Sequence, residues 1–297
     1  MSRKLRAIMV EMTNTCNARC PLCPTGAEKL DRDKGFISVE LFKKIVTEVN
    51  GFETPFQFIS YNYGEPFLHP KWFELYSELD EKIYHRTSTN GYVFYKKENI
   101  DKLAHSRLSE CIVSIDGSTN ELNSKYRKNV DFDKVYEGLQ YFFNEYGNKQ
   151  NRPKILIQTV LLPFNKDDLQ NIKLKFEGCF DKIYYKHANF NMTEFKENED
   201  INRNTEQKIT DLIPNSCSIF ASSLVINWNG VCNPCCHDYN GSVVLGDANR
   251  QSIKEIFNSS ESNNFYDQII SDRSKNKICS TCPIDRRTTN KRNINYY

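Results

Sequence analysis

Residues 6–23 read Arg6-Ala-Ile-Met-Val-Glu-Met-Thr-Asn-Thr-Cys16-Asn-Ala-Arg-Cys20-Pro-Leu-Cys23, an apolar strand-like run that leads directly into three closely spaced cysteines. The spacing brings three thiols onto one short loop and offers no fourth. Structural zinc sites close with four ligands, whereas a cubane iron–sulfur cluster held by three cysteines keeps one iron open for a further ligand. The loop therefore indicates chemistry at an open iron, and the alternative is a loop of reduced thiols without a metal.

The motif Cys16-x-x-x-Cys20-x-x-Cys23 resembles the signature of radical S-adenosylmethionine enzymes. In that family the open iron chelates the amino and carboxylate groups of the cofactor's methionine part. The residue before the third cysteine is usually aromatic; here it is Leu22, which we expect to pack against the adenine. The resemblance implies an enzyme that binds a [4Fe–4S] cluster and S-adenosylmethionine.

Length and composition are those of a soluble protein with one large α/β domain and a small appendage. The 297 residues carry a net charge of +2, from 40 basic and 38 acidic residues. This balance lacks the electrostatic footprint of a nucleic-acid or anionic-lipid binder. The apolar stretch at 7–10 is interrupted by Glu11 and is too short for a signal peptide or a membrane span. We therefore expect a cytoplasmic protein without nucleic-acid or membrane partners.

The chain has eleven cysteines, a high number for a cytoplasmic protein. The count is odd, and no secretory segment accompanies it. Metal binding therefore explains most of these cysteines better than a disulfide framework does.

From residue 6 to about 190, strand-like apolar runs alternate with helix-like segments. Six candidate strands fall at 6–12, 56–63, 86–89, 111–115, 155–162 and 183–185. A helix capped by Ser38 is expected through Val49. Six consecutive β-then-α units favour parallel pairing with right-handed crossovers, and because eight would close a barrel, six predict an open one. The predicted fold class is α/β, a partial (β/α)6 TIM-like barrel, which the family resemblance also implies.

We predict three segments along the chain: the barrel over 1–190, a polar linker or mobile loop over 191–214, and a small C-terminal domain over 215–297. The linker has hardly any apolar anchor. The C-terminal region is expected to contain a hairpin around Asn229-Gly230, followed by a short helix at 253–257.

Polar groups follow the predicted strands at their carboxyl ends, where function collects in parallel α/β folds. The second strand is followed by Tyr63-Gly64-Glu65-Pro66. This stretch is similar to the family's Gly-Gly-Glu-Pro motif, with Tyr63 in place of the first glycine. By this resemblance, Gly64 and Glu65 hold the amino group of the cofactor; the alternative is an ordinary turn.

The later strands end in hydroxyl, amide and carboxylate groups that suit a ribose or a carboxylate. Enzymes resembling this one use the serine before the Asp-Gly pair, here Ser114, and a downstream arginine, here Arg127. Asp116 has the alternative of tying down its own turn, and Gln158 that of a hydrogen bond within the core. Our predicted cofactor-binding residues in this group are Ser88, Asn90, Ser114, Asp116, Arg127 and Gln158.

A second group of cysteines lies near the carboxyl terminus. The spacing Cys217-x12-Gly230-x4-Cys235, followed by Cys279-x-x-Cys282, resembles the SPASM/twitch appendage of radical S-adenosylmethionine enzymes. The full SPASM form continues with more cysteines, whereas a cysteine-free tail follows here, so the shorter twitch form with one auxiliary [4Fe–4S] cluster is the better match. The resemblance implies Cys217, Cys235, Cys279 and Cys282 as its ligands, and a zinc site is the alternative.

Cys232 and Cys236 remain outside that set. In related peptide-modifying enzymes the position of Cys236 holds a catalytic aspartate. A cysteine there could donate a hydrogen atom to a substrate radical, as in epimerases of the wider family, and we predict Cys236 as the catalytic residue. The alternatives are a further cluster ligand or a packed thiol.

The resemblance implies a radical S-adenosylmethionine enzyme with two [4Fe–4S] clusters and an external one-electron reductant of the flavodoxin or ferredoxin type. Its 5′-deoxyadenosyl radical would abstract a hydrogen atom from the substrate. Many peptide-modifying relatives carry an N-terminal peptide-recognition domain, for which this chain has no room before its first strand. We therefore expect a small-molecule substrate (a sugar, aminocyclitol or nucleotide conjugate), with dehydrogenation or epimerisation as the outcome.

Two alternatives stay open at this point. The first is modification of a ribosomally made peptide. The second is a non-catalytic metal-binding or electron-transfer module, which would need no polar groups at six strand ends.

Overall fold

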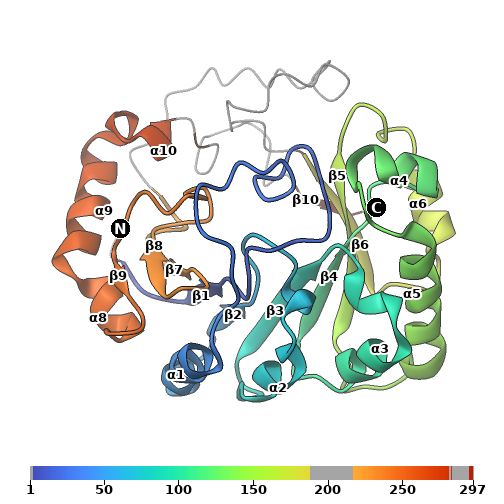
Figure 1. Cartoon of the computed structure of the whole chain (residues 1–297), viewed down its shortest axis with the longest axis horizontal. Coiled ribbons are helices and arrows are strands. Elements are labelled where there is room, and N and C mark those ends of the chain that lie inside the picture. Colours follow the sequence, from blue (N-terminus) through green and yellow to red (C-terminus); the bar gives the residue numbers. More distant parts are fainter. Residues whose placement is uncertain (1–2, 188–216, 281, 283–293, 297) are drawn as a thin grey trace.

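The computed structural model describes residues 3–187, 217–280, 282 and 294–296. Their strands form one sheet in the order β10-β6-β5-β4-β3-β2-β1-β7-β8-β9 (Figure 1). The strands are β1 (Ala7–Val10), β2 (Gln57–Ile59), β3 (Tyr84–Thr89), β4 (Glu110–Ser114), β5 (Lys154–Leu161), β6 (Lys182–His187), β7 (Ser223–Ile226), β8 (Val231–Asn233), β9 (Gly246–Asp247) and β10 (Ile294–Tyr296). The α-helices are α1 (Val39–Asn50), α2 (Trp72–Ser77), α3 (Lys97–Ala104), α4 (Asn120–Tyr126), α5 (Phe132–Tyr146), α6 (Leu169–Lys175), α8 (Ile253–Asn258), α9 (Ser260–Asp272) and α10 (Lys277–Ser280). Short 3-10 helices are η1 (Pro66–Leu68), η2 (Tyr92–Tyr95) and η4 (Arg273–Lys275).

Strands β1 to β6 pair in sequence order, and every one of these pairings is parallel. Helices lie between successive strands, as right-handed βαβ connections require. The predicted parallel α/β sheet is therefore confirmed, and its carboxyl ends meet along one edge.

Helix α1 begins where the sequence predicts. The hydroxyl of Ser38 accepts a hydrogen bond from the Leu41 amide at 3.0 Å and so caps the first turn. Phe42, Ile45 and Val49 lie on one face of the helix and are buried against the sheet. The 3.6-residue periodicity of these side chains is what makes the segment helical rather than extended.

The two faces of the sheet have different surroundings. On β4, Cys111 and Val113 point into the large core beneath the helices. Ile112, between them, points to the opposite face and packs with Leu156 and Tyr184 in a small separate cluster. This second face is the inner wall of the partial barrel.

The C-terminal region continues the same sheet. Strand β7 pairs in parallel with β1, from Ala7 with Ser223 to Val10 with Ile226. The predicted hairpin is present, since β7 and β8 are antiparallel and Gly230 takes a φ of +93° in the turn. The predicted boundaries at 190 and 215, and the linker between them, lie outside the described residues and stay predictions.

An ion pair joins the cysteine loop to the C-terminal region. The Arg32 guanidinium donates to both carboxylate oxygens of Glu11 at 2.8 Å, and to the Tyr239 carbonyl at 2.7 Å. Glu11 is fully buried and also accepts from the Trp228 amide. In Figure 1 the loop after β1 (blue) lies over the ends of the central strands, between the barrel helices and the C-terminal helices α8 and α9. Each helix of the described segments is too short or too polar to cross a bilayer.

Candidate functional site

The three-cysteine loop follows β1 and is held close to its own backbone. Cys16, Cys20 and Cys23 are free thiols, and the Ala18 amide donates to the sulfur of Cys16 at 3.4 Å. Gly26 packs so tightly that a Cβ there would lie 2.5 Å from the Cys20 nitrogen. The chain therefore needs a glycine at this position to bring its backbone against the cysteine loop.

Two residues predicted from the sequence reach the sulfurs of this loop. The side-chain amide of Asn90, directly after β3, donates to Cys16 Sγ at 3.6 Å and to Asn17 Oδ1 at 2.8 Å. The guanidinium of Arg127, at the end of α4, donates to Cys20 Sγ at 3.8 Å. Hydrogen-bond donors and a positive charge beside sulfur favour the thiolate form, which is the form that binds iron.

Burial opposes the charged form of two of these thiols, Cys16 and Cys20. Burial, with smaller contributions from the nearby Glu65, Cys23 and Cys20, raises the pKa of Cys16 to about 12, although the hydrogen bond from the Ala18 amide acts in the opposite direction. Burial also raises the pKa of Cys20, against the lowering effect of Arg127. Three thiols on one loop, with donors directed at two of them, fit a cluster that brings its own positive charge.

Gly64 is the second residue that must lack a side chain. It adopts a φ of +86°, and a Cβ there would lie 2.2 Å from the Thr13 carbonyl oxygen. The next amide, that of Glu65, donates to the Thr15 carbonyl at 2.9 Å. The turn after β2 is thus fixed on the segment that leads to Cys16.

The carboxylate of Glu65 is committed to protein donors. It accepts hydrogen bonds from the Thr89 hydroxyl and the Asn90 amide, both at 2.8 Å, and from the Phe67 amide at 3.3 Å. The side chain is buried, and burial raises its pKa to about 7. Glu65 therefore ties the end of β2 to the end of β3, and a direct role toward a cofactor stays a prediction.

Asn62 was not predicted from the sequence, yet it has a buried acceptor beside this turn. Its Oδ1 atom has no hydrogen-bond partner among the described residues. An unsatisfied buried carbonyl costs free energy, so a ligand that carries N–H donors fits this place. The amino group of S-adenosylmethionine is such a donor.

Asp116 lies at the centre of a buried hydrogen-bond network. Its carboxylate pairs with the guanidinium of Arg127 and accepts from the Val160 amide at 2.6 Å. Its backbone amide donates to Asn123, and its carbonyl accepts from Asn165. This geometry favours the turn-fixing alternative, with Asp116 orienting Arg127 toward Cys20.

The remaining predicted residues lie near the same edge without contacting the cysteines. Ser114 and Gln158 are register partners on β4 and β5, and Gln158 accepts from the Tyr184 hydroxyl at 3.4 Å. Ser88 is half-buried on β3, and Leu22 is half-buried in the cysteine loop, where it packs against the main core. Their predicted contacts with a cofactor stay predictions.

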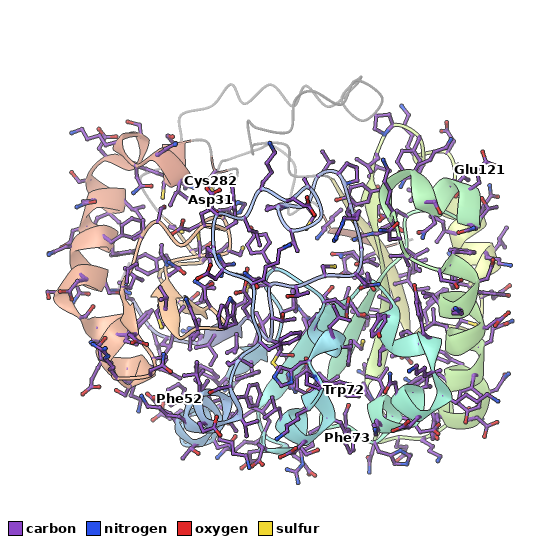
Figure 2. All side chains as sticks on the ribbon, viewed as in Figure 1. Asp31, Phe52, Trp72, Phe73, Glu121 and Cys282 are labelled. Atoms are coloured by element: carbon purple, nitrogen blue, oxygen red, sulfur yellow. The ribbon has the colours of Figure 1, made fainter. Side chains whose placement is uncertain are left out.

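The four predicted auxiliary ligands lie in one neighbourhood. The charges of Cys217 and Cys282 act on both Cys235 and Cys279, where burial is the first cause of the raised pKa. The sulfur of Cys217 accepts from the Phe220 amide at 3.4 Å. Figure 2 draws the side chains of the described residues on the ribbon and labels Cys282. Four thiols from segments far apart in the sequence thus lie close enough to act on one another electrostatically.

Arg273 is a further residue that sequence reasoning missed. Its side chain is almost fully buried and donates to the carbonyls of Cys279 at 3.2 Å and Cys282 at 3.5 Å. It fixes both ends of the C-x-x-C turn. The sequence carried no signal for it, because an arginine in a polar helix usually faces water.

The two leftover cysteines differ in their surroundings. Cys232 is fully buried in the core, and its thiol donates to the Gly230 carbonyl at 3.4 Å. Cys236 is part of the second group, since the charges of Cys282 and Cys217 act on it. Within the described ranges, no three side chains of His, Cys, Asp or Glu converge tightly enough to hold a single metal ion.

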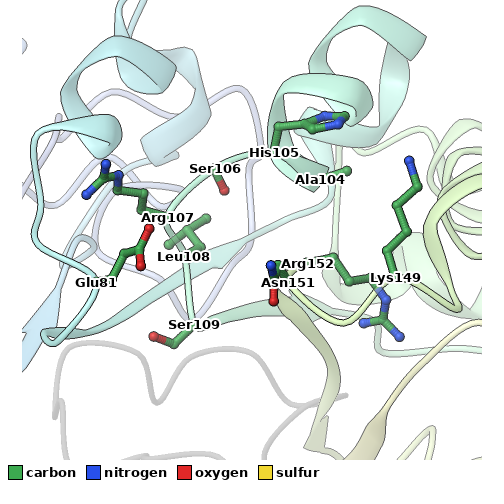
Figure 3. A pocket seen from close by; sticks show the side chains of 10 residues that line it. All are labelled: Glu81, Ala104, His105, Ser106, Arg107, Leu108, Ser109, Lys149, Asn151 and Arg152. Carbon is green, nitrogen blue, oxygen red and sulfur yellow. The ribbon is translucent and has the colours of Figure 1, made fainter.

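A cavity of about 510 Å³ lies at the opposite, amino-terminal end of the strands (Figure 3). Arg107, Lys149 and Arg152 line it, from the loops that precede β4 and β5. No cysteine contributes to its wall. Because sites in parallel α/β folds collect at the carboxyl ends of the strands, we place the candidate site at the cysteines and not in this cavity.

Two family models match the chain. Residues 10–175 match the radical SAM superfamily, and residues 217–283 match an iron–sulfur cluster-binding domain named SPASM. A curated relative, mycofactocin maturase MftC of Mycobacterium tuberculosis, is 31% identical over 134 residues, which are 44% of this chain. The match spans 32% of that relative, about a third of its length.

Solved structures share the fold. BtrN in complex with AdoMet and 2-DOIA aligns with a TM-score of 0.60 and 18% identity, over 95% of this chain and 94% of BtrN. SuiB of Streptococcus suis bound to S-adenosylmethionine aligns with a TM-score of 0.68 and 16% identity, over 95% of this chain and 71% of SuiB. At these identities the likeness concerns the fold alone.

Proposed function

The chain belongs to the radical SAM superfamily, and we propose that it abstracts a hydrogen atom from a polar small molecule, with dehydrogenation or epimerisation as the outcome. It is an enzyme with S-adenosylmethionine and two [4Fe–4S] clusters as cofactors, and it needs a reductant. When bound, the first cluster and S-adenosylmethionine supply a 5′-deoxyadenosyl radical that takes the hydrogen atom. The observation that carries the proposal is the meeting of the three-cysteine loop with Asn90 and Arg127.

The residues of the chain would bind and orient these groups. Cys16, Cys20 and Cys23 would hold the first cluster, while Asn90 and Arg127 stabilise its sulfurs by donating hydrogen bonds. The turn at Gly64 brings the backbone close to the first loop, where a bulkier residue would push it away. The buried ion pair of Asp116 with Arg127 would keep the guanidinium aimed at Cys20.

Cys217, Cys235, Cys279 and Cys282 would hold the auxiliary cluster, which suits a reaction that removes an electron from a product radical. Arg273 supports this role because it orients the carbonyls of two of these cysteines. Cys236 would be the hydrogen-atom donor if the outcome is epimerisation. Two observations support that assignment. Cys236 lies near Cys217 and Cys282, and unlike Cys232 it is not fully buried in the core.

Polar side chains on the inner wall support a polar small molecule as substrate. Ser88, Gln158 and Tyr184 carry hydroxyl and amide groups on this face, where a purely apolar lining would suit a lipid. The likeness to BtrN, whose structure contains 2-DOIA, extends over nearly the whole of both chains and agrees with this choice.

A peptide substrate is the second candidate. SuiB has been solved with its precursor peptide SuiA, and it aligns with this chain with a TM-score of 0.68. The curated relative is described as a maturase. These likenesses favour a peptide, whereas the likeness to BtrN, which covers nearly the whole of both chains, favours a small molecule.

The metal content tests the cofactor assignment. We expect about eight irons per chain after anaerobic reconstitution, because two cubane clusters contain four each. The variants Cys20→Ala and Cys235→Ala should each lose about four, from different clusters. Cys232→Ala is the matched control, since it removes a thiol that is packed in the core, and it should keep all of them. Zinc in place of half of the iron would contradict the auxiliary cluster.

Product analysis tests the substrate class. Reduced enzyme is incubated with S-adenosylmethionine and either a panel of sugars, aminocyclitols and nucleotide conjugates or a panel of short peptides. Release of 5′-deoxyadenosine above the rate without substrate should occur with a member of the first panel. The product should lose two hydrogens in a dehydrogenation, or keep its mass and take up solvent deuterium in an epimerisation. Stimulation by peptides alone would overturn the small-molecule proposal.

A further inference from the structure

Tyr63 connects the two cysteine sites across a large distance in the sequence. Its hydroxyl donates a hydrogen bond to the backbone carbonyl of Cys236 at 2.5 Å. Its ring also lies edge-on to that of Tyr239, with the centroids 6.3 Å apart. The side chain therefore reaches from the turn after β2 to the loop that contains Cys235 and Cys236.

The turn that carries Tyr63 is rigid on its other side. Gly64 lies against the Thr13 carbonyl, and the Glu65 amide donates to the Thr15 carbonyl at 2.9 Å. Both contacts are made by the segment that leads into Cys16. The backbone of this turn is thus held by the first cysteine loop, and the Tyr63 side chain extends from it toward Cys236.

The hydroxyl lies near both cysteine groups, since Cys236, Cys23 and Cys235 all act on it electrostatically. A tyrosine phenol is protonated at neutral pH, so it donates this hydrogen bond.

The acceptor of this hydrogen bond, the Cys236 carbonyl, shows what Tyr63 can position. The bond fixes the plane of the peptide between Cys236 and His237. The direction of the Cys236 thiol and the position of the adjacent Cys235 depend on that plane. Glycine, which occupies this position in the motif that the turn resembles, has no atom that could make the contact.

We propose that Tyr63 is a positioning residue that couples the turn at the first cluster to the auxiliary-cluster loop and sets the orientation of Cys235 and Cys236. The inference rests on the proposed function, because it takes Cys235 as an auxiliary ligand. The proposal predicts that removal of the Tyr63 hydroxyl, in the turn after β2, changes the geometry of the auxiliary cluster, although Tyr63 is not one of its ligands.

The test uses Tyr63→Phe, which removes the hydroxyl and keeps the ring that packs on Tyr239. Tyr63→Gly removes both and restores the glycine of the motif. Tyr146→Phe is the matched control, since Tyr146 ends α5 and its hydroxyl donates to Asp101 at 2.7 Å and not to a cysteine loop. Each variant is made in the full chain and in a Cys16→Ala/Cys20→Ala/Cys23→Ala background, where only the auxiliary cluster assembles.

Two measurements are made on anaerobically reconstituted protein. Hydrogen exchange reports the amides of 233–238, which we expect to exchange about fivefold faster in Tyr63→Phe, because a hydrogen bond of ordinary strength is lost. The electron paramagnetic resonance spectrum of the reduced auxiliary cluster should change its g-values in Tyr63→Phe, and change further in Tyr63→Gly. Tyr146→Phe should match the unmutated protein in both.

The outcomes separate the inference from the function on which it rests. Unchanged exchange and an unchanged spectrum in Tyr63→Phe, with the cluster present, would overturn the role of Tyr63 and leave the cofactor assignment intact. Absence of the auxiliary cluster from the unmutated triple-alanine background would overturn the cofactor assignment. In that case the proposed effect of Tyr63 on the cluster is overturned as well. The hydrogen-exchange measurement still decides whether Tyr63 holds the loop at 233–238.

Discussion

At the scale of single residues, Glu65 has surroundings that oppose its charge. Burial raises its pKa to about 7, although hydrogen bonds from Asn90 and Thr89 act in the opposite direction. In the unfolded chain the same carboxyl ionises near pH 4.5. Between these two values the folded state keeps a proton that the unfolded state has lost, so the free energy of unfolding decreases as the pH rises. The stability that the neutral form provides is complete below about pH 4.5 and is lost by about pH 7.

We predict that this loss disappears in Glu65→Gln, whose side chain does not titrate. The difference in unfolding free energy between the two proteins should change by about 3 kcal/mol between pH 4.5 and pH 7, in the direction that weakens the unmutated protein. Urea titrations at several pH values measure it. Glu98→Gln on α3 serves as a control, because Glu98 pairs with Lys102 at the surface. If the stability of the unmutated protein relative to Glu65→Gln stays constant or increases as the pH rises, the assignment is contradicted.

The sequence predicted residues that follow a strand end or match a family motif, and it missed those whose place follows from tertiary packing. Asn90 and Arg127 were predicted as site residues, and both reach cysteine sulfurs. Asn62 and Arg273 were missed, because their significance comes from an unpaired oxygen in one case and two distant carbonyls in the other. Neither feature has a local pattern. The spacing of the cysteines could not distinguish Cys232 from Cys236. In the structure they differ, because Cys232 is fully buried in the core.

At the scale of elements, prediction succeeded where apolar periodicity is strong. Helix α1 and the hairpin of β7 and β8 form where their cap and turn residues indicate. Helices α4 and α9 were not predicted. The reason is visible in their composition, since α4 buries only Asn123 and Tyr126, and α9 has a polar first half. Contacts with the rest of the protein, and not an amphipathic pattern, decide that such segments are helical.

Helix α5 carries an element-scale prediction in Gly138. By helix propensity alone, Gly138→Ala should stabilise the protein by roughly 1 kcal/mol. The structure predicts the opposite, because a Cβ at Gly138 would lie 2.2 Å from the Phe94 carbonyl oxygen of η2. Helix α5 would have to move away from η2, and overpacking of this kind costs about 1–3 kcal/mol.

Chemical denaturation measures the effect, with Gly51→Ala as the matched control. Gly51 follows α1 with a φ of −85°, and its nearest neighbour beyond the adjoining residues is the Glu48 oxygen at 3.3 Å. That substitution should be close to neutral. Equal effects of the two substitutions would show that the approach of α5 to η2 is not tight.

At the scale of the whole molecule, the sequence predicted a barrel and a small appendage, and the described strands join both into one sheet. Strand β1 pairs with β2 on one side and with β7 on the other, so its backbone belongs to both regions. No sequence pattern reveals this, because a central parallel strand reads as an apolar run whichever strands flank it. The ion pair of Glu11 and Arg32 reinforces the same junction.

A shared central strand predicts that the two regions unfold together. The chain has two tryptophans, and each reports one region: Trp72 packs in the barrel core against Phe67 and Tyr76, and Trp228 lies in the turn between β7 and β8. In Trp228→Phe the fluorescence reports Trp72, and in Trp72→Phe it reports Trp228.

Opening β7 alone would expose the hydrogen-bonding edge of β1 and leave buried Glu11 without the amide of residue 228, so partial unfolding is costly. We therefore expect the fluorescence and far-ultraviolet circular dichroism transitions to coincide within each variant during urea unfolding of the metal-free protein. A Trp228 transition at lower urea than the circular dichroism transition would mean that the C-terminal region separates from β1 first, and that the continuous sheet is two cooperative units.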